Sequence, residues 1–366
     1  MIVGIDLTWV KPQKSGGIES FARNLLDGIS IQDKTNRYTI FLSIDNYESF
    51  LHYAQYPNFK LIKCKCFANK VINRLLWLNL HFNKILKTHN IKVCLTPFYS
   101  KPLIKNKSCK TITVIHDLQA WHFPEYFSKT KVIWLKFAWK QTLKSSDIII
   151  AISNFVKQDI INQYGSRYQN KIKVIYNPIK ISNEQELYDI TKEPYFYTIC
   201  SPYKHKNFKT LILIMDRICN TYNKLLPKKL FVTGMKTFPK EIEILIKEKN
   251  LENNICLTGY IDNIKRDSYI KNAKLFLFPS IFEGFGMPVV ESLMLGTPVI
   301  TTNKTSIPEV SCNKAIYVSN PTDVNEWICK IEETLANSDK QKITFDQYDI
   351  KIIANQYIEL INFLGK

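Results

Sequence analysis

Short apolar runs alternate with longer segments of mixed polarity along most of the chain. Runs that end at Gly, Pro, Asn, Asp or Ser are typical of buried strands. The first half contains such runs at 1–7, 37–44, 92–98, 110–117, 147–153 and 172–178, and the second half at 194–201, 230–234, 255–260, 273–280 and 297–302. Strands that alternate in this way with helical segments predict largely parallel sheets.

A polar segment without a firm period interrupts this alternation. It reads IKISNEQELYDITKE (179–193) and follows Asn177-Pro178. We therefore predict a linker at 179–194, between a doubly wound N-terminal domain (1–178) and a second doubly wound domain (195–345). The 366 residues are enough for two domains of this kind, and 45% hydrophobic residues supply both cores.

The stretch PSIFEGFGMPVVESLMLGTPVITTNKTSIPEV (279–310) has the most specific local pattern. A strand at 275–278 is followed by a loop in which Gly284 and Gly286 allow close approach of the backbone to a ligand. Pro288 suits the first position of a helix that runs to Leu295, and Gly296 ends it. The unpaired amides and the positive dipole end at such a helix start favour a phosphate or a sugar hydroxyl.

Two acids flank this turn, Glu283 in the loop and Glu291 one turn inside the helix. Because the turn sets their separation, they can hold different ends of one ligand. An isolated glutamate is ordinarily a solvated residue, and that alternative applies to each acid taken singly. The glycines, the proline and the strand–loop–helix–strand order together favour a ligand site.

Composition narrows the class of protein further. No stretch of 18 apolar residues is present, and the N-terminus begins as a strand without a charged leader, so we expect a chain that is neither membrane-spanning nor secreted. Nine cysteines without any CxxC pair indicate reduced thiols and no structural zinc. No DxD triplet is present to hold a divalent metal.

The net charge of +18 is concentrated in the first half. Residues 1–178 hold 26 Lys and Arg against 10 Asp and Glu, a balance of +16. Between Glu48 and Asp117 there are 12 basic residues and no acid. A basic surface of this kind suits an anionic membrane or nucleic acid, but no recognisable nucleic-acid motif accompanies the charge.

The segment VINRLLWLNLHFNKILK (71–87) lies within this acid-free stretch. Apolar residues near helical spacing alternate there with basic ones. The residues that we predict to contact a membrane or a lipid-linked acceptor are Arg74, Trp77, Lys84 and Lys87. The alternative is an ordinary core helix with a solvated basic face.

Glu283, seven intervening residues and Glu291, within EGFGMPVVES and followed by GTPV and PEV, resemble the signature of glycosyltransferase family 4. The resemblance implies an α/β GT-B fold, with two facing Rossmann-like domains and a C-terminal helix (346–366) that returns to the N-terminal domain. It also implies a retaining enzyme that uses a nucleotide sugar. In that family the first acid lies by the donor sugar, the loop amides of Gly284, Phe285, Gly286 and Met287 hold sugar and diphosphate, and Glu291 binds the ribose.

Other family positions fall just after predicted strands, where ligands of doubly wound sheets bind. Gly16 and Gly17 correspond to a Gly-Gly loop near the donor, although such a pair usually marks only a turn. His116 and Asp117 resemble the family's HD motif, which implies that His116 faces the donor sugar while Asp117 braces the loop. An isolated histidine is more often structural, and His122 is interpreted in that way.

The C-terminal domain supplies the remaining positions. Lys206 resembles the family's basic residue that neutralises the leaving diphosphate. Many relatives carry an Arg a few residues upstream, where this chain has Cys200-Ser201-Pro202, and Lys204 is the nearest substitute. Gly259, Tyr260 and Ile261 would line the nucleotide base; core packing of Tyr260 is the alternative.

The resemblance therefore predicts a metal-independent hexosyl- or deoxyhexosyltransferase without a cofactor, with a GDP- or UDP-sugar as donor and mannosyl transfer as the first expectation. Its expected partners are a lipid-linked oligosaccharide acceptor of surface polysaccharide synthesis and the cytoplasmic face of the membrane, with no nucleic acid. Two other functions remain open. A GT-B sugar-nucleotide epimerase would need acid and base groups on both sides of the sugar ring and would lack the acceptor-dependent nucleotide release of a transferase. A basic nucleic-acid-binding protein would show steeply salt-dependent affinity.

Overall fold

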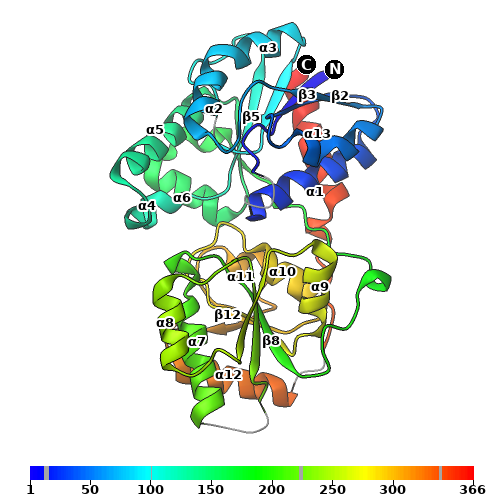
Figure 1. Cartoon of the computed structure of the whole chain (residues 1–366). Helices are drawn as coiled ribbons and strands as arrows, with labels where there is room; N and C mark the ends of the chain where they lie inside the picture. Colours follow the sequence, from blue (N-terminus) through cyan, green and yellow to red (C-terminus); the bar gives the residue numbers. More distant parts are fainter. Residues whose placement is uncertain (12–15, 100, 222–225, 338–339) are drawn as a thin grey trace. The chain divides into compact units, whose positions relative to one another are not determined.

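The computed structural model describes residues 1–11, 16–99, 101–221, 226–337 and 340–366 (Figure 1). The chain forms two compact units, the first comprising Met1–Ile179 with Asp346–Lys366 and the second Lys180–Phe345. Both units are parallel sheets covered by helices, the α/β GT-B class that the sequence predicts.

Unit 1 is built on a seven-stranded sheet of order β3-β2-β1-β4-β5-β6-β7. Its strands are β1 (Ile2–Asp6), β2 (Arg37–Leu42), β3 (Phe59–Lys63), β4 (Val93–Thr96), β5 (Lys110–Ile115), β6 (Ile148–Ala151) and β7 (Ile172–Val174). Its helices are α1 (Gly16–Gln32), α2 (Val71–Trp77), α3 (Asn83–Thr88), α4 (Gln119–His122), α5 (Lys129–Ser145), α6 (Asn154–Tyr164) and α13 (Ile350–Gly365), with a π-helical turn at Leu78–Phe82.

Unit 2 is built on a six-stranded sheet of order β10-β9-β8-β11-β12-β13. Its strands are β8 (Tyr195–Ile199), β9 (Lys229–Thr233), β10 (Ile255–Gly259), β11 (Leu275–Phe278), β12 (Val299–Thr302) and β13 (Ile316–Val318). Its helices are α7 (Phe208–Asp216), α8 (Lys240–Glu248), α9 (Asn263–Asn272), α10 (Met287–Met294), α11 (Ile307–Val310) and α12 (Val324–Asn337).

The eleven predicted strands are all present, and within the described ranges the sequence missed only β3 and β13. Each is one of the two outer strands of its sheet; the other outer strands, β7 and β10, were predicted. An edge strand is buried on fewer sides and carries a weaker apolar run than a central one. The sequence FKLIK of β3 alternates with lysine, and β13 has three residues, so neither gives a strong signal.

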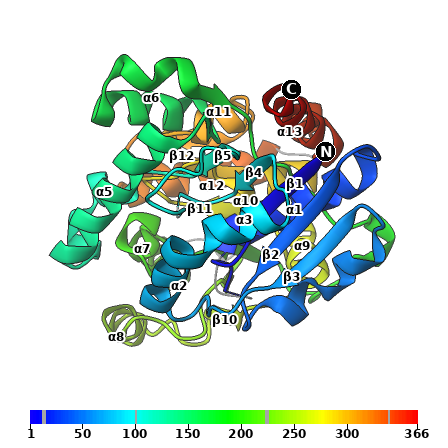
Figure 2. The same ribbon diagram turned by 90° about the horizontal axis from the view of Figure 1, so that it is seen from above.

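The C-terminal helix α13 packs against α1 in unit 1, as the sequence predicts (Figure 1). Gly28 makes this contact possible, because a β-carbon there would overlap the backbone of Ile350 and the side chain of Ala354. The last turn of α13 reaches Met1, so the two ends of the chain lie side by side (Figure 2).

The predicted linker is part of unit 2 from Lys180 onward. The backbone N–H and hydroxyl of Ser182 both donate to Asp267 of α9, at 2.8 Å each. The backbone N–H of Tyr188 donates to Ser268 of the same helix at 3.2 Å. These hydrogen bonds attach the polar linker segment to α9. Its hydrophobic pattern has no period and could not indicate this contact.

The 71–87 segment differs from the prediction. Arg74 and Trp77 are buried, so neither is the membrane contact that we expected. Trp77 packs with Leu78 and Phe82 in a core cluster of unit 1. Arg74 lies in the field of the buried Asp6 carboxylate at the end of β1; burial lowers the pKa of Arg74, and the Asp6 charge opposes that shift. A buried cation beside a buried acid explains why this arginine faces inward.

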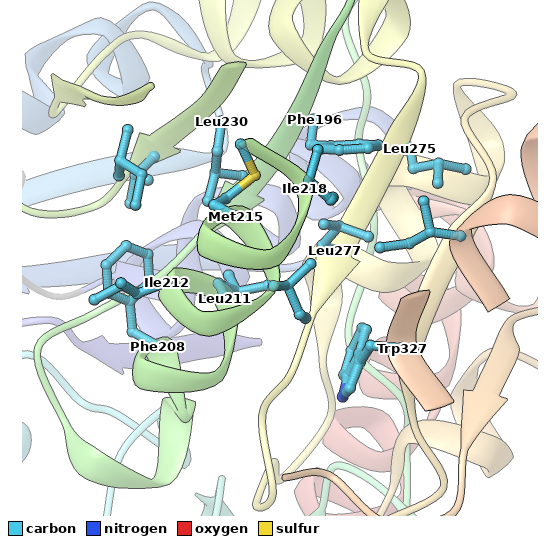
Figure 3. Packing of buried hydrophobic residues seen from close by; sticks show 14 of the residues in the cluster. Phe196, Phe208, Leu211, Ile212, Met215, Ile218, Leu230, Leu275, Leu277 and Trp327 are labelled. Carbon is cyan, nitrogen blue, oxygen red and sulfur yellow. The ribbon is translucent and has the colours of Figure 1, made fainter. Parts of the chain in front are cut away.

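The core of unit 2 forms around α7 (Figure 3). Leu211 and Met215 of α7 are fully buried against Phe196, Leu230 and Leu277 of the sheet. Trp327 of α12 closes the cluster and donates its indole N–H to the carbonyl of Pro321 at 3.2 Å. The loop that precedes α7 is thereby fixed at the carboxyl edge of the sheet.

Candidate active site

A lysine and a glutamate meet at the point where the strand order of unit 2 reverses. The chain passes from β8 outward to β9 on one side and later to β11 on the other, so the loops after β8 and β11 flank this switch point. Lys206 follows β8 and Glu283 follows β11, and their Nζ and Oε1 atoms are 2.6 Å apart. Ligands of doubly wound sheets bind at such switch points.

The turn before α7 fixes the position of Lys206. Residues Lys204–Lys206 form a 3₁₀ turn, and Asn207 then adopts a left-handed conformation (φ +52°) before the helix begins. The Asn207 amide donates to the Pro321 carbonyl at 2.9 Å. The neighbouring His205 carbonyl accepts from the Ile281 N–H at 2.9 Å, which joins the lysine turn to the glutamate loop.

His205 lies between two lysines but does not add to their charge. Burial lowers its pKa to about 3, with the charge of Lys206 acting in the same direction. The imidazole is therefore neutral at physiological pH. The partly buried cation of this turn is Lys206.

The glutamate loop is held by the segment that follows β12. The Glu283 N–H donates to the Thr305 hydroxyl at 3.0 Å, and the Ser306 hydroxyl lies 2.9 Å from the carbonyls of both Glu283 and Phe285. Gly286 has φ +93°, a conformation that favours glycine, and leads into α10. Phe285 and Met287 are buried, so the loop can offer a ligand their backbone rather than their side chains.

Glu291 is buried inside α10 and has a cationic partner that the sequence did not indicate. Arg266 of α9 lies 3.4 Å from Glu291 Oε1 and 2.8 Å from Asp267 Oδ1. Burial raises the pKa of Glu291, and Arg266 opposes that shift. Burial lowers the pKa of Arg266, but Glu291 and Asp267 outweigh it and raise the pKa overall. The three side chains form one charged cluster that also holds Ser182 through Asp267.

The remaining predicted donor residues of unit 2 lie at its carboxyl edge. Gly259 ends β10 with φ +75°. Tyr260 is 49% exposed, so the core-packing alternative is wrong for this residue. Ile261 is partly exposed beside it. Lys204 is exposed and lines a groove of about 420 Å³ between the lysine turn and α8.

Gly16, Gly17 and His116 all belong to unit 1. Gly16 and Gly17 form the first turn of α1 rather than a loop before it, and Gly16 has φ +54°. Phe21 of α1 meets the His116 ring edge-on, with ring centroids 4.9 Å apart. Helix α1 follows β1 and His116 follows β5, so both lie at the carboxyl edge of the sheet. This is close to the point between β1 and β4 where the strand order reverses.

The protonation of His116 follows from its surroundings. Its Nε2 is 2.8 Å from the Pro97 carbonyl, which can only accept, so this nitrogen carries the proton and Nδ1 is left as an acceptor. Burial lowers the pKa of His116 to about 4, partly opposed by that hydrogen bond. Asp117 accepts from the Gln119 N–H at 2.9 Å, consistent with bracing the loop, and His122 pairs with Asp159 at 2.9 Å in a structural contact.

Two family models match consecutive parts of this chain. Residues 15–183 match the model described as Glycosyltransferase Family 4, and residues 181–348 match the model described as Glycosyl transferases group 1. The chain belongs to the family 4 glycosyltransferases. The resemblance carried by EGFGMPVVES is thus confirmed over both units of this glycosyltransferase.

Curated relatives include enzymes of surface polysaccharide synthesis. The O-antigen chain mannosyltransferase RfbU of Salmonella typhimurium is 28% identical over 251 residues, 69% of this glycosyltransferase and 66% of that protein. O-antigen chain mannosyltransferase B of Escherichia coli is 23% identical, over 64% of this chain and 63% of that protein. The aligned part thus spans just under two thirds of these relatives' own length.

Solved structures similar to this glycosyltransferase support the fold. Anabaena HepE, solved with UDP and glucose, has a TM-score of 0.70 at 18% identity, with 99% of each chain covered. Sucrose-phosphate synthase from Thermosynechococcus elongatus has a TM-score of 0.68 at 16% identity, covering 100% of this chain and 95% of that one. At these identities the likeness shows the GT-B architecture alone.

Proposed function

We propose that the chain is a retaining, metal-independent glycosyltransferase that moves a hexose or deoxyhexose from a nucleotide diphosphate sugar to a glycan acceptor. The observation that carries the proposal is the Lys206–Glu283 pair at the switch point of unit 2, at 2.6 Å. A cation and a carboxylate held together there match the two needs of the donor, namely neutralisation of its diphosphate and binding of its sugar hydroxyls.

The pair also suggests how the free site responds to a donor. Lys206 and Glu283 neutralise one another when no ligand is bound. An entering diphosphate would take over the lysine, which frees the Glu283 carboxylate to accept from the sugar. The amides of residues 284–287 and the start of α10 would hold the diphosphate, while Glu291, paired with Arg266, accepts from the ribose hydroxyls.

The chemical step breaks the bond between the anomeric carbon and the diphosphate oxygen, whose electron pair leaves with the nucleotide. The acceptor hydroxyl attacks from the same face, so the configuration is retained, and its proton passes to the departing phosphate oxygen. Charge develops mainly on the leaving group, and Lys206 is the side chain placed to stabilise it. His116 is neutral and its Nδ1 can accept from a hydroxyl, which supports the sugar-binding role that the family resemblance implies for it.

The acceptor and setting are proposed from the relatives. The mannosyltransferases named above belong to O-antigen synthesis, and a Campylobacter jejuni relative, 29% identical over 47% of this chain, is named for a diphospho-undecaprenol acceptor. Mannose is therefore the first donor sugar to test, and a lipid-linked oligosaccharide the first acceptor. Such an acceptor would place the enzyme at the cytoplasmic face of the membrane. Among the described residues, no helix has the length and apolarity to cross that membrane.

A two-step assay tests the proposal. A thermal-shift screen over GDP-mannose, UDP-hexoses and deoxysugar nucleotides should identify a stabilising donor, because ligand binding raises the melting temperature. Nucleotide release must then depend on added acceptor, and NMR must show retained configuration. Conversion of the donor into an epimeric nucleotide sugar, without acceptor-dependent nucleotide release, would instead support an epimerase. Loss of activity in EDTA with rescue by magnesium or manganese would refute metal independence.

A further inference from the structure

The solvent side of the 71–82 helical segment is aliphatic rather than basic. Ile72, Leu76 and Leu80 recur every fourth residue and are 77%, 59% and 73% exposed. This spacing aligns them along one side of the helix. A single exposed leucine is ordinary, but a contiguous exposed row marks a contact surface.

Two other segments of unit 1 extend this row. The loop after Lys101 exposes Leu103 and Ile104, the latter at 74%. It is tied along the π-helical turn, because Asn79 accepts from the Leu103 N–H at 2.9 Å and Asn83 donates to the Ile104 carbonyl at 3.0 Å.

Helix α5 contributes the third segment. Ile133 is 70% exposed, and Phe137 follows it one turn later. Trp134 and Ala138 of α5 line a small groove together with Leu75 of α2, so the two helices are neighbours (Figure 2). We name the resulting surface the aliphatic face; it comprises Ile72, Leu76, Leu80, Leu103, Ile104, Ile133 and Phe137.

The segments that carry the aliphatic face are rich in lysine, although Lys105 and Lys110 pair with Asp147. Residues 49–116 include 12 basic residues and no Asp or Glu, and residues 126–146 include five lysines and no Asp or Glu. Lys84, Lys87 and Lys140 are exposed in these segments. Aliphatic side chains next to exposed lysines are the combination that binds the interface of an anionic bilayer.

We propose that the aliphatic face docks on an anionic lipid bilayer, with the aliphatic side chains entering the interface and the lysines facing the headgroups. The inference rests on the proposed function, since a lipid-linked acceptor would lie in that bilayer. It replaces Arg74 and Trp77, which are buried, with a different set of contact residues.

Charge distinguishes the bilayer from other occupants. Two copies of the face would bring lysines of equal sign together in a symmetric dimer, which costs association energy. Nucleic acid suits the lysines, but its affinity comes mainly from phosphate contacts and leaves the aliphatic row without a role. Only an anionic membrane accounts for both features of the surface.

The test compares a triple variant of the aliphatic face and a double control variant with the unaltered protein. Leu76→Ser, Leu80→Ser and Ile104→Ser together remove the centre of the face. The matched control, Ile31→Ser with Ile352→Ser, changes exposed isoleucines outside it. Surface substitutions of this kind leave stability nearly unchanged, which melting curves verify.

Vesicle flotation is measured without any substrate, on phosphatidylglycerol–phosphatidylethanolamine vesicles and on phosphatidylcholine vesicles. We expect binding to the anionic vesicles that weakens with salt, and a loss of about tenfold or more in the triple variant but not in the control. Trp134 supplies a second readout, because brominated lipids should quench fluorescence that Trp134→Phe removes.

Three results would overturn the proposal. Equal binding by the triple variant and the control would show that lysines alone suffice. A dimer that light scattering detects and that the triple variant dissociates would make the face a contact between copies. Binding to RNA or DNA with none to vesicles would assign the lysines to nucleic acid.

Nucleotide affinity, measured by calorimetry on the same variants, separates this proposal from the proposed function. If vesicle binding is lost while donor affinity stays unchanged, the face acts apart from the donor site. If no nucleotide sugar binds but the vesicle results are as expected, the proposed glycosyl transfer is refuted while the membrane-docking proposal remains supported.

Discussion

At the scale of single residues, the Lys206–Glu283 pair links the two loops that flank the switch point. Both side chains are mostly shielded, with side-chain exposures of 19% and 13%. A charged pair in such a position depends strongly on its partner, because either charge alone is left poorly solvated. The pair therefore contributes both to the order of the free site and, in the proposed mechanism, to catalysis.

Lys206→Ala should lower kcat about 100- to 1000-fold, the typical effect of removing one preorganised stabiliser of a leaving group. Glu283→Ala should also act mainly on kcat, whereas Glu291→Ala should mainly raise the nucleotide Kd. Steady-state kinetics and calorimetry measure these effects. Lys209→Ala, on an exposed lysine three residues further on, is the control. Equal losses of kcat and affinity in all three site variants would contradict these separate roles.

His116 should make the protein less stable in acid. Its folded pKa of about 4 lies below the unfolded value of about 6.5, so the unfolded state binds the proton first. The contribution of His116 is complete above pH 6.5 and is lost as the pH falls toward 4, by about 3 kcal/mol at most. Urea unfolding measures the free energy of unfolding between pH 7.5 and 4.5. As the pH falls, this free energy should decrease less in His116→Gln than in the unaltered protein.

Glutamine suits this comparison because its amide can still donate to Pro97 but does not titrate in this range. His81→Gln, at an exposed position, is the control and should decline like the unaltered protein. If His116→Gln declines as steeply as the unaltered protein, His116 is not buried in the neutral form.

At the scale of elements, one contact between two helices stabilises each unit. The α1–α13 contact depends on the absence of a side chain at Gly28. The α9–α10 contact depends on the charged cluster of Arg266, Asp267 and Glu291. Helices α1 and α13 lie near opposite ends of the chain, whereas α9 and α10 are consecutive helices. Each contact joins an element of the proposed site to one outside it.

Gly28→Ala should destabilise the protein by about 1–3 kcal/mol, because the methyl group overlaps α13. Helix propensity alone predicts the opposite sign, a gain of up to about 1 kcal/mol for Ala over Gly. Thermal unfolding gives the sign, and limited proteolysis should show earlier release of the C-terminal helix. A stabilised variant would mean that α13 does not pack this closely.

Arg266→Met should weaken nucleotide binding more at pH 6 than at pH 8. Without the arginine, burial raises the pKa of Glu291 further, and a protonated Glu291 accepts poorly from ribose hydroxyls. Calorimetry at the two pH values measures the difference. Ser182→Ala removes only the far end of the cluster and should leave affinity independent of pH. An equal loss at both pH values would reduce Arg266 to a purely structural role.

At the scale of the whole molecule, the chain forms two compact units with separate cores. The proposed donor groups Lys206, Glu283 and Glu291 all belong to unit 2, whereas His116 and the aliphatic face belong to unit 1. Nucleotide binding and membrane docking are thus proposed for different units. This division allows each to be measured without the other.

Hydrogen exchange with saturating nucleotide should reveal that division. At about 100 times Kd a ligand stabilises its binding unit by about 2.7 kcal/mol. We expect added protection at 204–207, 259–261 and 283–291, and little change at 71–88. Anionic vesicles should protect 71–82 and 129–138 instead. Protection by nucleotide confined to unit 1 would contradict the assignment of the donor site.

The sequence by itself determined the features that depend on local pattern. Buried parallel strands give continuous apolar runs, and the turn before α10 needs glycine because its backbone adopts a positive φ. Both features can therefore be recognised from the sequence alone. The same holds for Glu283, Glu291 and Lys206, which follow strand ends that a parallel sheet brings to one edge. The edge strands β3 and β13 lack that local signal.

Only the tertiary structure decided which residues face one another. Arg266 reads as an ordinary residue of a polar helix until α9 packs beside α10 and places it against Glu291. Arg74 and Trp77 point inward because Asp6 and the unit 1 core lie on that side, which leaves Ile72, Leu76 and Leu80 outward. A segment that is apolar on two sides has no single stripe for periodicity to detect, so packing against the rest of the chain selects the buried side.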